Sequence, residues 1–156
     1  MSNNRAPVFK VLSLMIVLAA ATFLNGCVYH DYNSPHIEGV LTRQGQPLAN
    51  VNVSLANSAQ IMQTTTTDSK GYFSLAPKGE WNVFIPIGPQ DRFTRWSVII
   101  EQGSETLTGY QDSGIGGVFS GYSSNDRVSL NCDLSQANIK TDKSEVHYFC
   151  KVQTRE

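Results

Sequence analysis

A period-two alternation of apolar and polar residues is the feature that most constrains the fold of this chain. In residues 51–56, Val, Val and Leu alternate with Asn, Ser and Ala, and a similar alternation runs through residues 81–87. Residues 64–67 are four threonines, whose β-branched side chains suit a pleated sheet. Alternation of this kind turns one face of a strand toward a core and the other toward water. The sequence therefore predicts half-buried β-strands.

Turn sequences separate these strands at short intervals. They lie at residues 44–47, 68–71 and 77–80, where Asp can start a turn and Gly can supply a positive φ. A turn about every ten residues is typical of an antiparallel sandwich or barrel. Residues 135–144 are the segment best suited to a short helix or a loop, and no part of the chain after residue 27 has a sustained helical stripe. We therefore predict one all-β domain over residues 37–156.

The N-terminal segment is expected to be an export signal rather than part of this domain. Arg5 and Lys10 give it a basic start, and an uncharged apolar run follows at residues 11–23. That run is shorter than the roughly 20 residues that a bilayer-spanning helix needs. A basic start followed by a short apolar run and small residues is typical of a secretory signal peptide.

The end of this segment, Leu-Asn-Gly-Cys at residues 24–27, resembles the bacterial lipobox. The resemblance implies a signal peptide at 1–26, acylation of Cys27 and a tether over residues 27–36. Three of the four residues match the lipobox pattern, whereas Asn25 stands where Ala, Ser or Thr is more common. Acyl chains on a cysteine bind a membrane through their buried methylene groups.

The expected location follows from the same resemblance. Val28 stands at the position where an Asp tends to retain lipoproteins in the inner membrane. Because this chain has Val28 there instead of Asp, the resemblance implies a lipid-anchored protein of the outer membrane that faces the periplasm. An ordinary signal peptide that happens to precede Cys27, and an uncleaved N-terminal anchor, remain the alternatives.

The first half of the predicted domain resembles the carboxypeptidase regulatory-like domain. The motifs that carry this resemblance occur in the order of the family pattern: Gly39-Val40, Gly45-Gln46-Pro47-Leu48, Val51-Asn52-Val53, Thr67-Asp68-Ser69-Lys70-Gly71-Tyr72-Phe73-Ser74-Leu75 and Gly79-Glu80-Trp81. The resemblance covers residues 37–87. It implies a transthyretin-like, immunoglobulin-like antiparallel β-sandwich that serves as an accessory module. It implies no activity, because function resides in sites rather than in folds.

The residues of the longest motif have expected structural roles. The carboxylate of Asp68 can cap the turn, and Gly71 can adopt the left-handed conformation that closes it. Phe73 and Leu75 are two residues apart, so both are expected to point into the core. Trp81 is expected to start the next strand and to cover one end of the sandwich.

The second half of the domain has further alternating segments and the remaining two cysteines. In residues 93–101 the apolar face carries Trp96, and residues 105–110 are expected to pair with this strand. Cys132 and Cys150 both fall on the apolar face of late strands. In an exported chain such a pair is expected to form a disulfide, with two buried thiols as the alternative.

Composition and motifs exclude several classes of function. Twelve Lys and Arg residues against thirteen Asp and Glu residues give a net charge of −1, without the basic surface that nucleic-acid binding requires. His30, Asp31 and His36 could ligate a metal, but they are better interpreted as solvated linker residues. The sequence has no nucleophile elbow and no phosphate loop. We therefore expect neither a cofactor nor catalysis.

The glycine-rich segment 109–126 is the candidate recognition loop. Glycine gives such a loop freedom, and Tyr110, Phe119 and Tyr122 offer contact area at a small entropic cost. The alternative is that these three aromatic residues pack on the sheet. Phe93, Arg95 and Trp96 form a second candidate surface, although Trp96 is more typical of a core residue and Arg95 of a solvated one.

These observations favour a non-enzymatic envelope lipoprotein. The expected function is that of a binding or structural accessory module that recognises a protein or an envelope polymer through its loops. The second hypothesis is a protective lipoprotein that binds an incoming toxin or other protein. The third, a hydrolase, requires a converging set of His, Asp and Glu side chains.

Overall fold

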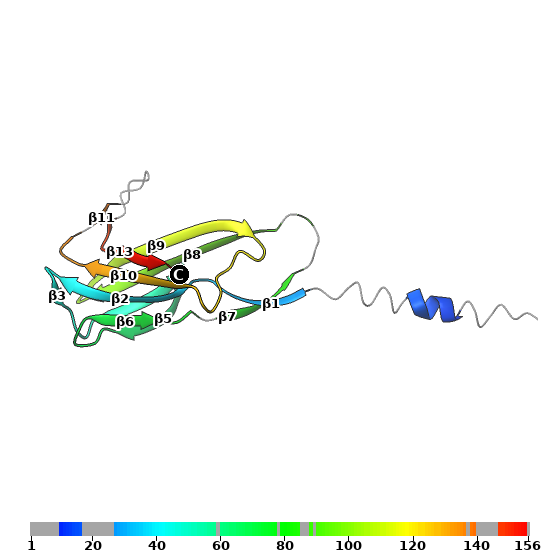
Figure 1. The fold of residues 1–156 in the computed structure, drawn as a ribbon, viewed down its shortest axis with the longest axis horizontal. Coiled ribbons are helices and arrows are strands. Elements are labelled where there is room, and N and C mark those ends of the chain that lie inside the picture. Colours follow the sequence, from blue (N-terminus) through cyan, green and yellow to red (C-terminus); the bar gives the residue numbers. More distant parts are fainter. Residues whose placement is uncertain are drawn as a thin grey trace, which may run out of the picture. The chain divides into compact units, whose positions relative to one another are not determined.

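The structure is a computed structural model that describes residues 10–16, 27–58, 60–77, 79–84, 88, 90–136, 138–139 and 147–155. The chain divides into two compact units, of which the smaller comprises residues 1–29 and 81–88 and the larger comprises residues 30–80 and 89–156. A short helix at 10–16 is followed by strands β1 to β13 (Figure 1). The described residues contain no helix with the length and apolar character needed to cross a membrane.

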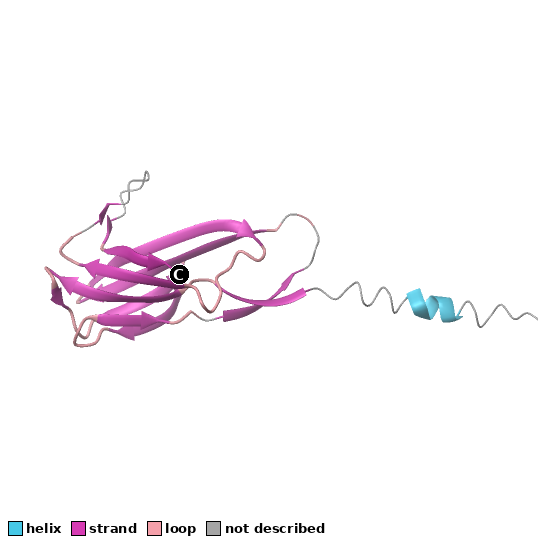
Figure 2. Ribbon diagram, in the orientation of Figure 1, coloured by secondary structure: helices cyan, strands magenta, loops and turns pink. Residues whose placement is uncertain are grey.

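The larger unit is built from two β-sheets. In the first sheet β13 pairs with β10, β10 pairs with β2, and β2 also pairs with β3 and β6. Its strands are β2 (His36–Arg43), β3 (Gln46–Pro47), β6 (Tyr72–Leu75), β10 (Arg127–Asp133) and β13 (Cys150–Arg155). The second sheet has the order β5-β4-β8-β9, with β4 (Asn52–Asn57), β5 (Gln60–Thr66), β8 (Asp91–Gln102) and β9 (Glu105–Gly117). The predicted all-β sandwich is confirmed (Figure 2).

Strand pairing is antiparallel throughout these two sheets with one exception. β2 and β10 run parallel, with Arg127 opposite His36 and Asp133 opposite Thr42. Parallel neighbours need a long crossover connection. Here the chain between β2 and β10 supplies it by building the whole second sheet.

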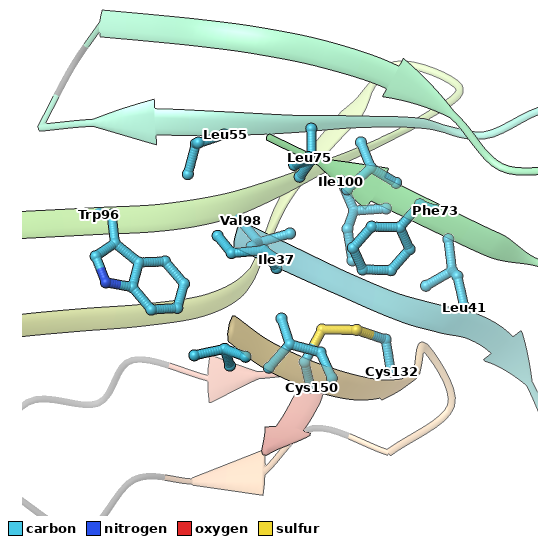
Figure 3. Packing of buried hydrophobic residues seen from close by; sticks show 13 residues of the cluster. Ile37, Leu41, Leu55, Phe73, Leu75, Trp96, Val98, Ile100, Cys132 and Cys150 are labelled. Atoms are coloured by element: carbon cyan, nitrogen blue, oxygen red, sulfur yellow. A yellow bond between two sulfur atoms is a disulfide. The ribbon is translucent and has the colours of Figure 1, made fainter. Parts of the chain in front are cut away.

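The core lies between the two sheets. It includes Trp96, Val98 and Ile100 of β8, which alternate toward the interior as their spacing predicts. From the first sheet, Ile37, Leu41, Phe73 and Leu75 meet them; Figure 3 shows these side chains from close by. Burial of this apolar surface is the main term that stabilises such a sandwich.

The turn before β6 has the geometry that its sequence predicts. The backbone N–H groups of Lys70 and Tyr72 each donate a hydrogen bond of 2.8 Å to Oδ1 of Asp68. Gly71 has a φ of 74°, and a Cβ there would lie 2.3 Å from the carbonyl oxygen of Leu41. The turn therefore requires glycine for both its conformation and its close approach to β2.

The predicted disulfide is present. Cys132 on β10 and Cys150 on β13 are opposite each other in register, and their sulfur atoms are bonded within the core (Figure 3). Gly109 of β9 faces the bridge, because a Cβ at this position would lie 3.0 Å from Sγ of Cys150. The bridge therefore holds the edge strand β13 to the centre of its sheet.

Two shorter strand pairs complete the described residues. β1 (Cys27–Tyr32) pairs with β7 (Gly79–Phe84), and β11 (Asn138–Ile139) pairs with β12 (His147–Tyr148). The prediction of a helix or loop at 135–144 is wrong at residues 138–139, which form strand β11. Residues 137 and 140–144 lie outside the described residues. The expectation that Trp81 is a covered residue is also wrong, because its side chain is 74% exposed. Alternation showed that Trp81 lies on a strand but not which face of that strand is covered.

Candidate partner-binding surface

Half of the expected recognition loop is a strand. Residues 109–117 continue β9 and pair with β8 as far as Asp91 opposite Gly117, so only residues 118–126 connect β9 to β10. Glycine is a poor strand former, but the long partner strand β8 supplies the ladder of hydrogen bonds. Composition therefore gave the wrong boundary for this segment.

Tyr110 of β9 has a packing role. Its ring lies beside Trp96, with 5.4 Å between the ring centroids, and beside Tyr148 at 6.3 Å. Arg155 donates a 3.2 Å hydrogen bond to the Tyr110 hydroxyl oxygen. Burial raises the pKa of Tyr110 above its usual value. The Tyr110 ring therefore packs against the sandwich.

Tyr122 is also held in place by the fold. The indole Nε1–H of Trp96 donates a 3.0 Å hydrogen bond to the Tyr122 hydroxyl, and the backbone of Tyr122 exchanges two hydrogen bonds with Tyr32. Burial raises the pKa of Tyr122 as well. The alternative in which the tyrosines pack on the sheet therefore describes both Tyr110 and Tyr122.

We predict that Tyr122→Phe lowers the free energy of unfolding by about 1–3 kcal/mol. The substitution leaves the indole N–H of Trp96 without its partner, and that side chain is only 1% exposed. Urea denaturation followed by far-UV circular dichroism measures the effect. The matched control is Tyr72→Phe, because the Tyr72 hydroxyl donates to Glu38 at an exposed site. Equal effects of the two substitutions would contradict the proposed role of Tyr122.

Two of the exposed apolar residues lie at the far end of β8 and β9. β4 pairs with β8 only between Ser97 and Glu101, so the preceding half of β8 has β9 as its sole partner among the strands described. On this two-stranded arm Phe93 and Ile115 are directly opposite each other, 61% and 77% exposed. We call this pair the arm patch. Contiguous exposed apolar side chains of this kind mark sites of interaction.

Phe119 lies in the turn that follows the arm. The turn is closed by a 2.9 Å hydrogen bond from the Ser120 backbone N–H to the Gly117 carbonyl oxygen. Ser120 packs closely on Gly116, where an added Cβ would be 2.4 Å from that of Ser120. The Phe119 side chain is exposed. Of the three aromatic residues predicted for recognition, Phe119 alone is largely exposed to solvent.

A small groove of about 220 Å³ lies beside Tyr122. Arg155 forms a 2.9 Å ion pair with Asp112 in it, and Asp126 and Arg127 complete its charged lining. Opposite charges are present in equal number, so the groove favours neither anions nor cations. A larger hollow of about 520 Å³ includes Asp133, whose pKa is lowered by hydrogen bonds from Ser135.

The three residues considered as metal ligands do not converge. Asp31 is buried and forms an ion pair with Arg92, so it is not the solvated linker residue that the sequence suggested. His36 shares a 3.0 Å hydrogen bond with Ser74, and His30 is exposed. Within the described part of the chain, no group of three His, Cys, Asp or Glu residues is placed to hold a metal ion.

The position of Cys27 is defined by its backbone. It is the first residue of β1, the strand that pairs with β7. Val28, which follows it, has an exposed side chain. The candidate lipidation site therefore begins an ordered strand pair.

Comparison with known proteins gives a family. No curated protein matches the sequence significantly. A solved structure, that of 3-chlorocatechol 1,2-dioxygenase from Rhodococcus opacus 1CP, is similar with a TM-score of 0.32 and 15% identity. The match covers 76% of this chain and 56% of that one, and similarity at this level shows nothing about activity. Residues 37–137, well over half of the chain, match the model of a domain of unknown function, DUF6795, and the protein therefore belongs to the DUF6795 family.

Proposed function

We propose that this protein is a lipid-anchored lipoprotein of the bacterial envelope that acts as a binding or structural accessory module. Its partner is a protein or an envelope polymer that contacts the arm patch. The observation that carries this proposal is the exposure of Phe93 and Ile115, opposite each other on an arm that extends beyond the pairing with β4. Many apolar side chains of this size, such as those of Phe73 and Ile100, are buried in this sandwich.

The proposal of a lipid anchor rests on the sequence around Cys27. The helix at 10–16 overlaps the apolar run at 11–23 that is expected of a signal peptide, and its large apolar side chains are exposed. The Cys132–Cys150 disulfide supports an oxidising compartment, because such bridges are rare in the bacterial cytosol. Both features agree with export to the outer membrane and a domain that faces the periplasm.

We also propose that the sandwich is a carboxypeptidase regulatory-like module. The turn formed by Asp68 and Gly71, together with the inward side chains of Phe73 and Leu75, supports this proposal. In this module the motif has a structural role, since it closes a turn and supplies core residues. The partner must then be recognised elsewhere on the domain.

Replacement of Cys27 by Ser is expected to release the protein from membranes into the soluble fraction. The hydroxyl cannot take the thioether-linked diacylglyceryl group, so the acyl chains that hold the protein are lost. Fractionation of cells followed by immunoblotting measures the distribution. The matched control is Asn25→Ala, which brings the lipobox closer to its usual pattern and is expected to leave the protein on membranes. Continued sedimentation of the Cys27→Ser variant with membranes would contradict the anchor.

A photo-crosslinking amino acid at position 115 is expected to give a discrete adduct in intact cells. The arm patch is the proposed contact, whereas Ile61 of β5 is a similarly exposed apolar residue elsewhere on the same sheet. Crosslinkers at 115 and 61 are compared by immunoblotting and mass spectrometry. An adduct shared by both positions, or none at 115, would contradict the arm patch. An adduct with an imported toxin would select the protective role over the structural one.

A further inference from the structure

A second apolar surface lies on the smaller unit, next to the candidate lipidation site. β1 and β7 pair with each other, and the parts of these strands that belong to that unit are residues 27–29 and 81–84 (Figure 1). Val28, Trp81 and Val83 of these segments are all exposed. Trp81 and Val83 are two residues apart on β7, so they lie on the same face of the pair. We call these three residues the ribbon face.

The segment from Trp81 to Gly88 has no charged residue, although Glu80 precedes it directly. Residues 81–88 include one tryptophan, one valine, one phenylalanine and two isoleucines, without any Lys, Arg, Asp or Glu. Tryptophan is enriched where membrane meets water, because its ring is apolar and its N–H is polar. Protein interfaces usually have a polar rim, whereas contact with a lipid surface depends largely on the apolar area that it buries. The composition therefore favours a lipid surface.

The distance to the proposed anchor is short. Val28 follows Cys27 directly, and consecutive residues of a strand are about 3.3 Å apart along its axis. β7 is the paired neighbour of β1, and paired strands are about 4.8 Å apart. Acyl chains on Cys27 would thus bring the beginning of the strand pair to the lipid headgroups.

We propose that the ribbon face docks on the lipid bilayer, with Trp81 in the headgroup region, as a second membrane contact beside the lipidated Cys27. This inference rests on the proposed function, because it requires the acyl chains at Cys27. A protein held only by acyl chains on one residue can change its orientation relative to the membrane. Docking of the ribbon face would fix how the strand pair lies on the membrane.

The two tryptophans of the chain make the proposal measurable. Trp81 is exposed, whereas Trp96 is buried in the core and acts as an internal reference. The full-length lipidated protein is reconstituted into phosphatidylcholine vesicles in which part of the lipid is brominated near the headgroup end of its acyl chains. Bromine quenches tryptophan fluorescence on contact. We expect loss of the Trp81 emission in the wild type and no loss in Trp81→Phe, which retains only Trp96.

The matched variants are Val83→Glu and Ile61→Glu. Val83→Glu puts a charge on the ribbon face and is expected to abolish quenching while the lipid still holds the protein on floating vesicles. Ile61→Glu introduces the same charge at an exposed site of β5 and is expected to leave quenching unchanged. Quenching that persists in Val83→Glu would overturn the proposal.

Mass spectrometry and flotation distinguish a failure of the proposed lipid anchor from a failure of the proposed docking. A protein that carries no acyl chains and does not float overturns the proposed anchor, and the docking of the ribbon face falls with it. A protein that is acylated and floats, but whose Trp81 is not quenched, overturns the docking alone. That second result would also be obtained if a protein partner or a second copy covered the ribbon face.

Discussion

Replacement of both Cys132 and Cys150 by Ala is expected to lower the free energy of unfolding by about 3 kcal/mol. The bridge closes a loop between residues separated by 18 positions and so restricts the unfolded chain. It also holds β13, an edge strand of the first sheet, against β10. Both sulfur atoms are buried in the core, so the bridge is protected from solvent in the folded state.

The effect is measured by urea denaturation of the wild type and the variant, with and without reductant. Replacement by Ser instead of Ala separates two contributions, because it removes the same bridge but buries two hydroxyl groups. We expect Ser to be the more destabilising, since buried polar groups without partners lower stability further. An unfolding midpoint that responds neither to reductant nor to the Ala variant would show that the bridge contributes nothing.

Much of the fold could be predicted from local patterns. The turn of Asp68 and Gly71 and the inward face of β8 depend on neighbouring residues, and the sequence indicated both correctly. The parallel pairing of β2 with β10 could not be predicted, because alternation reports the faces of a strand and not its neighbours. The same limit explains Trp81, whose strand was expected but whose exposed position was not.

The candidate site was harder to predict than the fold. Tyr110 and Tyr122 were named for recognition because aromatic residues among glycines suggest a loop, yet Trp96 and the sheet hold both of them. Phe93 was named as part of a second surface, but Ile115 was missed. Ile115 belongs to the arm patch because it lies opposite Phe93, and this register exists only because β9 extends through residue 117. Residues 111–117 contain one large apolar residue, Ile115, so no apolar alternation revealed this part of the strand.

Replacement of Phe73 by Ala is expected to destabilise the protein by about 3–5 kcal/mol, the largest effect of a single core substitution considered. Phe73 is almost fully buried and pairs in register with Gly39 of β2. A Cβ at Gly39 would lie 2.8 Å from Cζ of the phenyl ring, so the ring fills the space that the glycine leaves. Urea denaturation measures the loss, and an effect below that of Tyr122→Phe would contradict this packing.

Gly39→Ala tests the same contact from the other side. Its added methyl group would lie 2.6 Å from the carbonyl oxygen of Leu130 and against the Phe73 ring, so we expect a loss of about 1–3 kcal/mol. In a Phe73→Ala background the ring is absent but the Leu130 carbonyl remains, and the loss should therefore become smaller without vanishing. The coupling in this double-mutant cycle measures the ring's contribution. Gly117→Ala is the matched control, because a Cβ there has no neighbour within 4 Å; equal effects at 39 and 117 would contradict the close packing of β2 on β6.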